Sequence, residues 1–151
     1  MAPKCKRYLA TDFSPAAISS IETLKSSRDD LQSVEVQQTN ADSLDELTEQ
    51  FDVIVINSVA QYFPDQNYLL EVLATANRLL VDGGHIFLGD LRSLPLLEAY
   101  HTSVQLWQAD SDTALSELAE RVRQRIEQEE ELLIDPHFFT ALPAQLPRIS
   151  N

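Results

Sequence analysis

The chain contains few cysteines, basic residues and glycines, and it has no long apolar run. Its one cysteine, Cys5, cannot form an internal disulfide bond, which fits a reducing compartment. No apolar stretch approaches the roughly 20 residues that a membrane helix requires, and the first residues lack the apolar core of a signal peptide. These shortages argue against a disulfide scaffold and a membrane protein, and we expect a cytoplasmic location.

The scarcity of basic residues limits the partners of the protein. Eleven Lys and Arg face 24 Asp and Glu, which gives a formal net charge of -13. Because neutralised phosphates supply most non-specific affinity for nucleic acids, a DNA or RNA substrate is disfavoured. We predict no metal site. The 44% hydrophobic content and the 151 residues predict one folded domain with one core.

The most informative stretch is Phe51 to Phe63, FDVIVINSVAQYF. Its run of Val and Ile predicts a strand that is buried on both faces, as in a parallel sheet. Asn57 and Ser58 then interrupt the apolar run. Open α/β sheets bind ligands outside the carboxyl ends of their strands, so we predict a site at Asn57 to Tyr62. The alternative is that Asn57 and Ser58 only satisfy backbone groups where the strand ends.

Two strands and a helix are predicted before this stretch. Arg7 to Thr11 and Ser33 to Gln38 have the composition of short strands. Between them, Ser14 is a helix N-cap, and Pro15 begins a helix that runs to about Arg28. Leu44 and Leu47 indicate a short helical turn before the central strand.

After this stretch the pattern alternates again and then becomes helical. Asp65 caps a helix whose apolar stripe is spaced by four, three and four residues, and Gly83-Gly84 ends it. The sequence then predicts the strand His85 to Leu88 and a helix from Leu94 to Gln108. A long helix follows from Asp112 to Ile134, in which Glu117 is expected to pair with Arg121. The remaining tail is predicted to contain no further strand. The stripe consists of Leu69, Leu73, Ala76 and Leu80.

The alternation of strands and helices predicts an α/β fold with a mainly parallel sheet and flanking helices. Within one domain, residues 1–92 are predicted to form the partial cofactor-binding core. Residues 93–151 are predicted to form a C-terminal helical segment that acts as a lid or linker.

Several ordered segments resemble a known family. YLATDFSP, NADSL, FDVIVINSVAQYFP and LLVDGGHIFLGDLR resemble class I S-adenosylmethionine-dependent methyltransferases, whose fold is Rossmann-like. NSVAQYFPD, GDLRSLPLLEAYHTSVQLWQA and EEELLIDPHFF are similar to methyltransferase domains of nonribosomal peptide synthetases, those of microcystin type in particular. The resemblance covers nearly the whole chain, and it implies S-adenosylmethionine as the cofactor.

The resemblance implies a cofactor site. Asp12 matches the acidic residue that accepts hydrogen bonds from the ribose hydroxyls, and a carboxylate can take two such donors. Asp42 matches the residue that holds the adenine amino group, with Ala41 beside it. The alternatives are a turn aspartate before a helix for Asp12 and a helix cap over Ser43 to Leu47 for Asp42.

The resemblance also implies a catalytic region. Asn57 and Ser58 match the loop that faces the methyl donor, whereas Gln61 and Tyr62 follow near the acceptor nitrogen. Asn57 and Tyr62 are therefore the candidate catalytic residues, and Phe63 is interpreted as a core aromatic. His101 is a further candidate helper, although a lone His on a helix is more often structural.

The chain departs from this family at its beginning and end. Its three glycines all follow Asp12, so the glycine-rich loop of the family is absent, and the first and last two strands have no counterpart. We expect a truncated domain with weak or lost cofactor binding. The strands flanking the missing one then either pair directly or associate with another copy, because open strand edges carry unpaired backbone groups.

Three interpretations of function remain open. The first is part of a methyltransferase domain that methylates the nitrogen of a carrier-bound aminoacyl or peptidyl amide. Neighbouring synthetase domains are then its partners, and carbon methylation is a variant. The second is a non-catalytic α/β remnant that serves as an interaction or spacer module. The third is a nicotinamide-dependent dehydrogenase, in which Asp12 also binds ribose.

Overall fold

The computed structural model describes residues 1–44 and 47–150, and the chain divides into two compact units. The first unit is Met1–Glu49, and the second is Gln50–Asn151. The predicted division of the chain at residues 92 and 93 remains a prediction.

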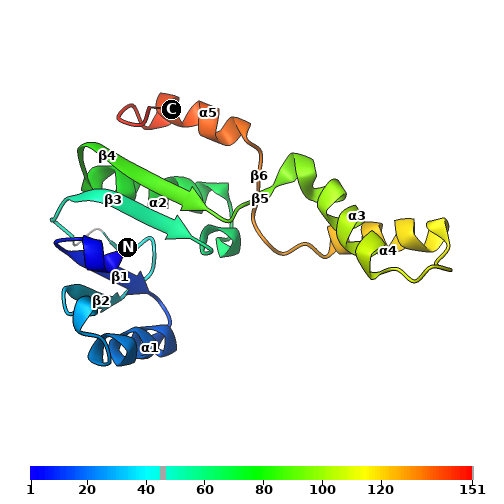
Figure 1. Ribbon diagram of the computed structural model, residues 1–151. Coiled ribbons are helices and arrows are strands. Elements are labelled where there is room, and N and C mark those ends of the chain that lie inside the picture. Colours follow the sequence, from blue (N-terminus) through cyan, green and yellow to red (C-terminus); the bar gives the residue numbers. More distant parts are fainter. Residues whose placement is uncertain (45–46, 151) are drawn as a thin grey trace. The chain divides into compact units, whose positions relative to one another are not determined.

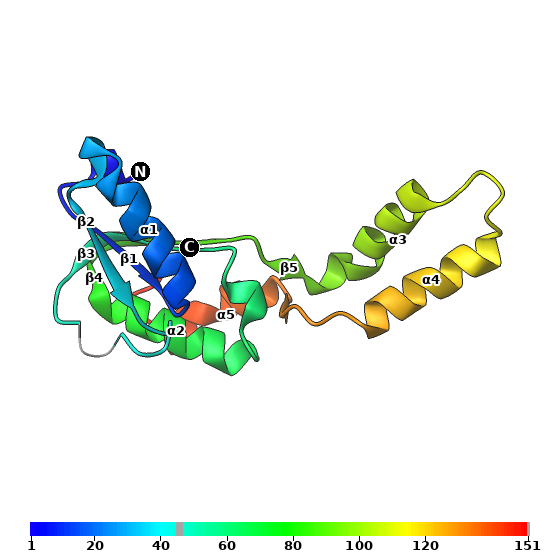
Figure 2. The ribbon, with the colours of Figure 1, turned by 90° about the horizontal axis from the view of Figure 1, so that it is seen from below.

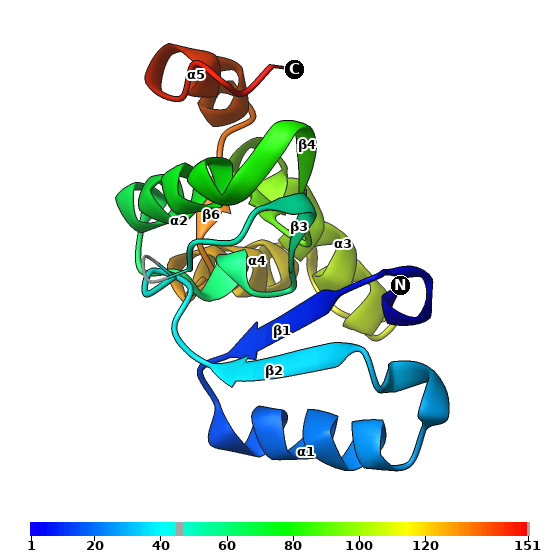
Figure 3. The same ribbon diagram turned by 90° about the vertical axis from the view of Figure 1, so that its left-hand side faces the viewer.

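The first unit is a strand–helix–strand arrangement. Strands β1 (Tyr8–Asp12) and β2 (Val34–Gln38) form a parallel pair with Asp12 opposite Gln38. Helix α1 (Pro15–Ser26) lies along this pair (Figure 3), and the Ser14 side chain accepts its N-cap bond from Ala17 N at 3.4 Å. Short 3₁₀ turns occupy Ala2–Lys4 and Asp29–Leu31. The predicted strands, helix and cap are confirmed, whereas the helical turn at Leu44 to Leu47 lies partly outside the described residues.

The second unit contains the central strand. Strand β3 (Phe51–Asn57) pairs in parallel with β4 (Leu80–Gly89), with Asn57 opposite Gly89. Between them lie a 3₁₀ turn, Ala60–Tyr62, and helix α2 (Gln66–Leu79), which Asp65 caps through Tyr68 N at 2.9 Å. Helix α2 ends four residues before Gly83, so the two glycines do not end the helix but lie inside β4, where its pairing with β3 is irregular.

The core of the second unit lies around α2, which buries Leu69, Val72, Leu73, Ala76 and Leu79. The prediction that the central strand is buried on both faces is wrong. Val53, Val55 and Phe87, which share one face of the β3–β4 pair, are exposed, while Ile54 and Ile56 on the other face are half buried. The burial alternates because successive residues of a strand point to opposite faces and only one of these faces is covered.

A helical hairpin extends from the end of β4 (Figures 1 and 2). A 3₁₀ turn (Leu94–Leu96) leads into α3 (Leu97–Gln108), and α4 (Leu115–Glu127) returns beside it. The two ends of the hairpin are joined by the two-residue parallel strands β5 (Arg92–Ser93) and β6 (Leu133–Ile134). The predicted helix to Ile134 is therefore too long, although the predicted Glu117–Arg121 pair is present at 2.6 Å.

The chain continues into helix α5 (His137–Gln145), which contains Pro143. The Arg148 guanidinium then donates to the carbonyl oxygens of Asn77 and Leu80 and pairs with Asp82 at 3.0 Å. These bonds tie the tail to the end of α2. Across residues 1–44 and 47–150, no helix has the length and apolar character needed to cross a membrane.

The predicted fold class is confirmed as α/β with parallel strand pairing. Among the described residues, the strands form three parallel pairs, β1–β2, β3–β4 and β5–β6. Direct pairing between the strands that flank the missing one remains a prediction.

Candidate functional site

The carboxyl end of β1 carries Asp12, which lies where the family resemblance expects a ribose-binding carboxylate. Asp12 Oδ1 accepts the backbone N–H of Ser14 at 2.7 Å, and Asp12 O accepts that of Thr39 at 3.0 Å. The turn role proposed as the alternative is therefore real. It uses one carboxylate oxygen, and Oδ2 has no partner among the described residues, so the half-buried carboxylate retains acceptor capacity.

Ala41 and Asp42 lie in the turn that follows β2. This turn closes with a hydrogen bond from Ser43 N to Asn40 O at 3.1 Å. The exposed Asp42 carboxylate accepts the Ser43 hydroxyl at 2.9 Å, and Ala41 is half buried beside it. The turn thus presents a carboxylate acceptor within the same unit as Asp12.

The carboxyl ends of β3 and β4 are joined by a chain of side-chain hydrogen bonds. Asn57 Nδ2 donates to Ser58 Oγ at 2.9 Å, and Ser58 Oγ donates to Asp90 Oδ2 at 2.8 Å. Gln61 Nε2 lies 3.5 Å from the same Asp90 oxygen. Because these bonds join side chains, they go beyond the backbone role proposed as the alternative for Asn57 and Ser58.

Ser58 and Asp90 share an uncommon backbone conformation. Their φ angles are 57° and 62°, which is the left-handed region that few residues other than glycine adopt. Residues held there cost free energy and cluster at functional sites. The two residues leave adjacent parallel strands and meet through their side chains, so this strained pair marks the strand ends as a candidate site.

Gly89 makes room for this arrangement. A Cβ atom at Gly89 would lie 2.3 Å from Asn57 Oδ1 and 2.8 Å from Phe87 Cε1. Any larger residue would therefore displace the Asn57 amide.

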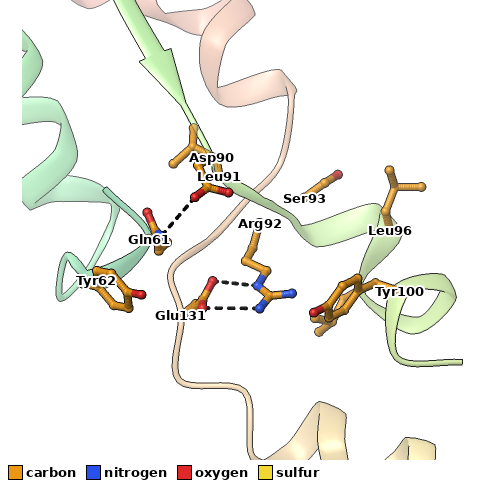
Figure 4. A pocket seen from close by; sticks show the side chains of 10 residues that line it. Gln61, Tyr62, Asp90, Leu91, Arg92, Ser93, Leu96, Tyr100 and Glu131 are labelled. Carbon is orange, nitrogen blue, oxygen red and sulfur yellow. Dashed lines mark hydrogen bonds and ion pairs between the residues drawn. The ribbon is translucent and has the colours of Figure 1, made fainter. Parts of the chain in front are cut away.

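A cavity of about 590 Å³ opens beside Asp90 (Figure 4). Gln61 and Tyr62 line one side, and the start of the helical hairpin lines the other. Gln61 is 5% exposed, and its Oε1 atom is buried without a hydrogen-bond partner in the described structure, whereas Tyr62 is 72% exposed. The remaining lining residues are Leu91, Arg92, Ser93, Leu96, Leu97, Tyr100 and Glu131.

An ion pair holds the far wall of the cavity. Arg92 Nε donates to Glu131 at 2.6 Å and Nη2 donates to the second Glu131 oxygen at 3.3 Å, while the guanidinium lies 4.3 Å from the centre of the Tyr100 ring. The hydrogen bond to Glu131 raises the pKa of Arg92 above its ordinary value. The Arg92 guanidinium is thus already bound by residues of the same cavity wall.

The structure separates the predicted site residues between the two units. Asp12, Ala41 and Asp42 lie in the first unit, and Asn57, Ser58 and Tyr62 lie in the second. Phe63 is buried against Tyr68, as expected of a core aromatic.

His101 supports the structural alternative, because it is buried and its Nε2 lies 3.1 Å from Glu129 Oε2. It lies outside the lining of the cavity beside Asp90.

Sequence reasoning missed Asp90 and Glu131 as site residues. Asp90 directly follows a predicted strand, so the strand-end rule that selected Asn57 would also have selected it. Glu131 had no such signal, because its place depends on the pairing of β5 with β6.

The comparisons with known proteins identify the family. Residues 1–86 match the family model described as a methyltransferase domain, which is more than half of the chain. The chain belongs to the methyltransferase-domain family. S-adenosylmethionine is the cofactor that membership of this family indicates.

The curated relatives are very long proteins. Chondramide synthase cmdD from Chondromyces crocatus is 47% identical over 100% of this chain, which spans 4% of that protein. CymA from Salinispora arenicola, described as a probable non-canonical nonribosomal peptide synthetase, is 38% identical over 91% of this chain, which spans 2% of it. The methyltransferase domain therefore corresponds to a small part of each relative.

Solved structures share the fold. The N-methyltransferase NodS from Bradyrhizobium japonicum WM9 is 24% identical with a TM-score of 0.54, covering 79% of this chain and 61% of its own. PKMT2 from Rickettsia typhi, solved in complex with AdoHcy, is 21% identical with a TM-score of 0.55, covering 80% and 23%. The Rossmann-like class I methyltransferase fold is thereby shown.

The residues of the first unit fit the chemistry of this cofactor. Ribose hydroxyls and the adenine amino group are hydrogen-bond donors, and Asp12 and Asp42 present carboxylate acceptors. The carboxylate oxygen of Asp12 that Ser14 does not use is what a ribose hydroxyl requires.

Proposed function

We propose that the chain is part of an S-adenosylmethionine-dependent methyltransferase domain that acts in nonribosomal peptide synthesis. Its reaction is N-methylation of an aminoacyl or peptidyl amide carried on a partner protein, and carbon methylation is a variant of it. The synthetase relatives support this setting. The observation that carries the proposal is Asp12, whose carboxylate retains a free acceptor at a strand end within the matched family region.

Each predicted residue has a role in this proposal. Asp12 accepts the ribose hydroxyls, Asp42 accepts the adenine amino group, and Ala41 lies beside Asp42. Bound S-adenosylmethionine supplies an already activated methyl group, so the protein needs only to align donor and acceptor and to exclude water.

In the second unit, Asn57 and Ser58 face the methyl donor. Tyr62 is the catalytic candidate on the acceptor side, and Asn57 is its counterpart on the donor side. The exposed ring of Tyr62 and the hydrogen bonds of Asn57 and Ser58 support these roles.

The proposed partners follow from the synthetase relatives. They are a carrier protein that presents the acceptor and the neighbouring synthetase domains, and the proposed location is the cytoplasm. Among the described residues of its unit, β3 pairs with β4 only, so we include self-association through strand edges as a further mode of contact.

A second candidate function has its own support. The carboxylates of Asp12 and Asp42 each bond to a group one or two residues away, as residues that only shape a turn do. These bonds favour a non-catalytic interaction or spacer module.

Calorimetric titration of the chain with S-adenosylhomocysteine distinguishes the two candidates. Micromolar binding that the substitution Asp12→Ala abolishes, through loss of the ribose acceptor, would support the methyltransferase function and overturn the expectation that this chain binds the cofactor weakly or not at all. The control is Asp29→Ala, which removes an exposed carboxylate of the same unit and should bind as the unmodified chain does. A chain that is folded by circular dichroism and does not bind would support the spacer function.

A further inference from the structure

The cavity beside Asp90 combines an acceptor with apolar walls. Asp90 Oδ2 receives the Ser58 hydroxyl at 2.8 Å and lies 3.5 Å from Gln61 Nε2. Asp90 Oδ1 has no hydrogen-bond partner among the described residues. One oxygen is thus held in place, and the other remains available to a donor on a ligand.

The charges that line the cavity favour a ligand with N–H groups. Asp90 and Glu131 are carboxylates, and the one cation among the lining residues, Arg92, already binds Glu131 with two hydrogen bonds. An anionic ligand would therefore meet Asp90 without a free counter-charge. An N–H donor would instead gain a charge-assisted hydrogen bond.

The apolar lining is available because its rings and aliphatic side chains are exposed. Tyr62 is 72% exposed, Leu96 is 62% exposed and Tyr100 is 43% exposed. Solitary exposed apolar residues are common, but these three line one cavity, as Figure 4 shows for its labelled side chains. Covering them removes apolar surface from water, and aromatic rings offer stacking faces in addition.

We propose that this cavity is the acceptor site and that it selects an aromatic or branched aliphatic acceptor whose N–H group donates to Asp90. The inference rests on the proposed methyltransferase function. Ser58 and Gln61 position the carboxylate, while Tyr62, Leu96 and Tyr100 contact the side chain of the acceptor. An acceptor without a side chain, such as a glycyl group, leaves the apolar wall uncovered and binds weakly.

The test is a ¹H–¹⁵N NMR titration of the full chain with two small probes, L-phenylalaninamide and glycinamide. The probes share the same amine and amide and differ only in the side chain. About 0.15 M salt screens the negative field of the rest of the chain beyond about 8 Å. We expect phenylalaninamide to bind at least tenfold more tightly than glycinamide, with shifts centred on residues 90–100.

Three variants separate the parts of the site. Asp90→Asn keeps the shape and tolerates the left-handed backbone, so its loss of charge should weaken phenylalaninamide binding about tenfold or more. Tyr62→Ala changes an exposed side chain and should bring the affinities for the two probes closer together. The matched control, Asp112→Asn, removes the same charge from an exposed position and should change neither affinity.

The outcomes decide the proposal separately from the function on which it rests. Equal affinity for both probes, or equal binding by Asp90→Asn and the unmodified chain, would overturn it even if S-adenosylhomocysteine binds. If Asp90→Asn does not fold, the Tyr62→Ala ratio still decides the side-chain selectivity. Selective probe binding without S-adenosylhomocysteine binding would support the acceptor site and reject cofactor binding by this chain.

Discussion

The two units of the chain differ in how much of their apolar surface they bury. In the described part of the first unit, Val34 is the one buried hydrophobic residue, and α1 buries none. The second unit buries five residues of α2 alone. Burial of apolar surface is the main favourable contribution to folding, so the free energy of unfolding should be concentrated in the second unit.

The hydrogen bonds of the polar side chains at the strand ends also differ between the two units. The side-chain carboxylates of Asp12 and Asp42 bond to groups one or two residues away, whereas the side chains of Ser58 and Asp90 join two strands across 32 positions of sequence. Local bonds persist in a loosely packed unit, but a bond between strands requires the strands to be held in register. The second unit therefore provides the more fixed geometry.

The largest expected effect is in the core of the second unit. Leu69 is fully buried, so Leu69→Ala should lower the free energy of unfolding by about 3 kcal/mol through lost burial and the remaining cavity. Ile21→Ala in the half-buried face of α1 should cost about 1 kcal/mol. Urea titrations that follow amide signals of each unit measure both changes, and equal losses would contradict the contrast between the units.

A smaller effect is expected at the strand ends of the second unit. Gly89→Ala places a Cβ atom against Asn57 Oδ1 and should destabilise by about 1 to 2 kcal/mol, because overpacked sites force side chains to move. It should also shift the side-chain amide signals of Asn57. Gly83→Ala is the comparison. The φ of 77° would strain an alanine at this position, but no atom lies within 4 Å of the added Cβ. Unchanged Asn57 signals in Gly89→Ala would contradict the crowding.

A smaller effect still is expected at a buried contact of the second unit, in which His101 Nε2 lies 3.1 Å from Glu129 Oε2. Burial raises the pKa of Glu129, but the backbone N–H of Glu131 and the side chain of His101 outweigh it, so the pKa lies below the ordinary value. A lowered carboxyl pKa contributes stability above the ordinary value of 4.5 that is lost as the pH falls through the lowered pKa. Glu129→Gln should therefore reduce stability at pH 7 and flatten the loss of stability in acid.

The counterpart of Glu129→Gln in the first unit is Glu35→Gln. Its partner Arg7 is exposed, and exposed pairs are screened by solvent and salt. Its effect at pH 7 should be smaller than that of Glu129→Gln, as measured by urea titration at several pH values. A larger effect for Glu35→Gln would reverse the contrast between the units.

Local sequence signals predicted most elements of the fold. Ser14 and Asp65 cap their helices as expected, and each predicted strand of the core is present, because caps and apolar runs depend on neighbours in sequence. The end of α4 was predicted wrongly. Helical periodicity continues to Leu133, but tertiary pairing of Leu133 with Arg92 and of Ile134 with Ser93 makes these two residues a strand.

The sequence predicted the part of the candidate site that depends on neighbours in sequence. Asn57, Ser58 and Tyr62 were found because they follow a recognisable strand. The wall formed by Arg92, Tyr100 and Glu131 was not, since the ion pair joins residues 39 positions apart and the sequence does not indicate that contact. Exposure of Val53 and Val55 was also missed, because an apolar strand does not reveal which of its faces another element covers.

The hairpin of α3 and α4 leaves and returns at adjacent points, where Arg92 lies opposite Leu133. A segment whose ends are adjacent can be lengthened, shortened or exchanged at little cost to the scaffold from which it departs. Arg92 and Tyr100 lie near its base and line the cavity. Recombination at the paired strands β5 and β6 would thus change the wall of the cavity while β3 and β4 stay the same. Exchange of the hairpin is therefore an evolutionary route to a new acceptor selectivity.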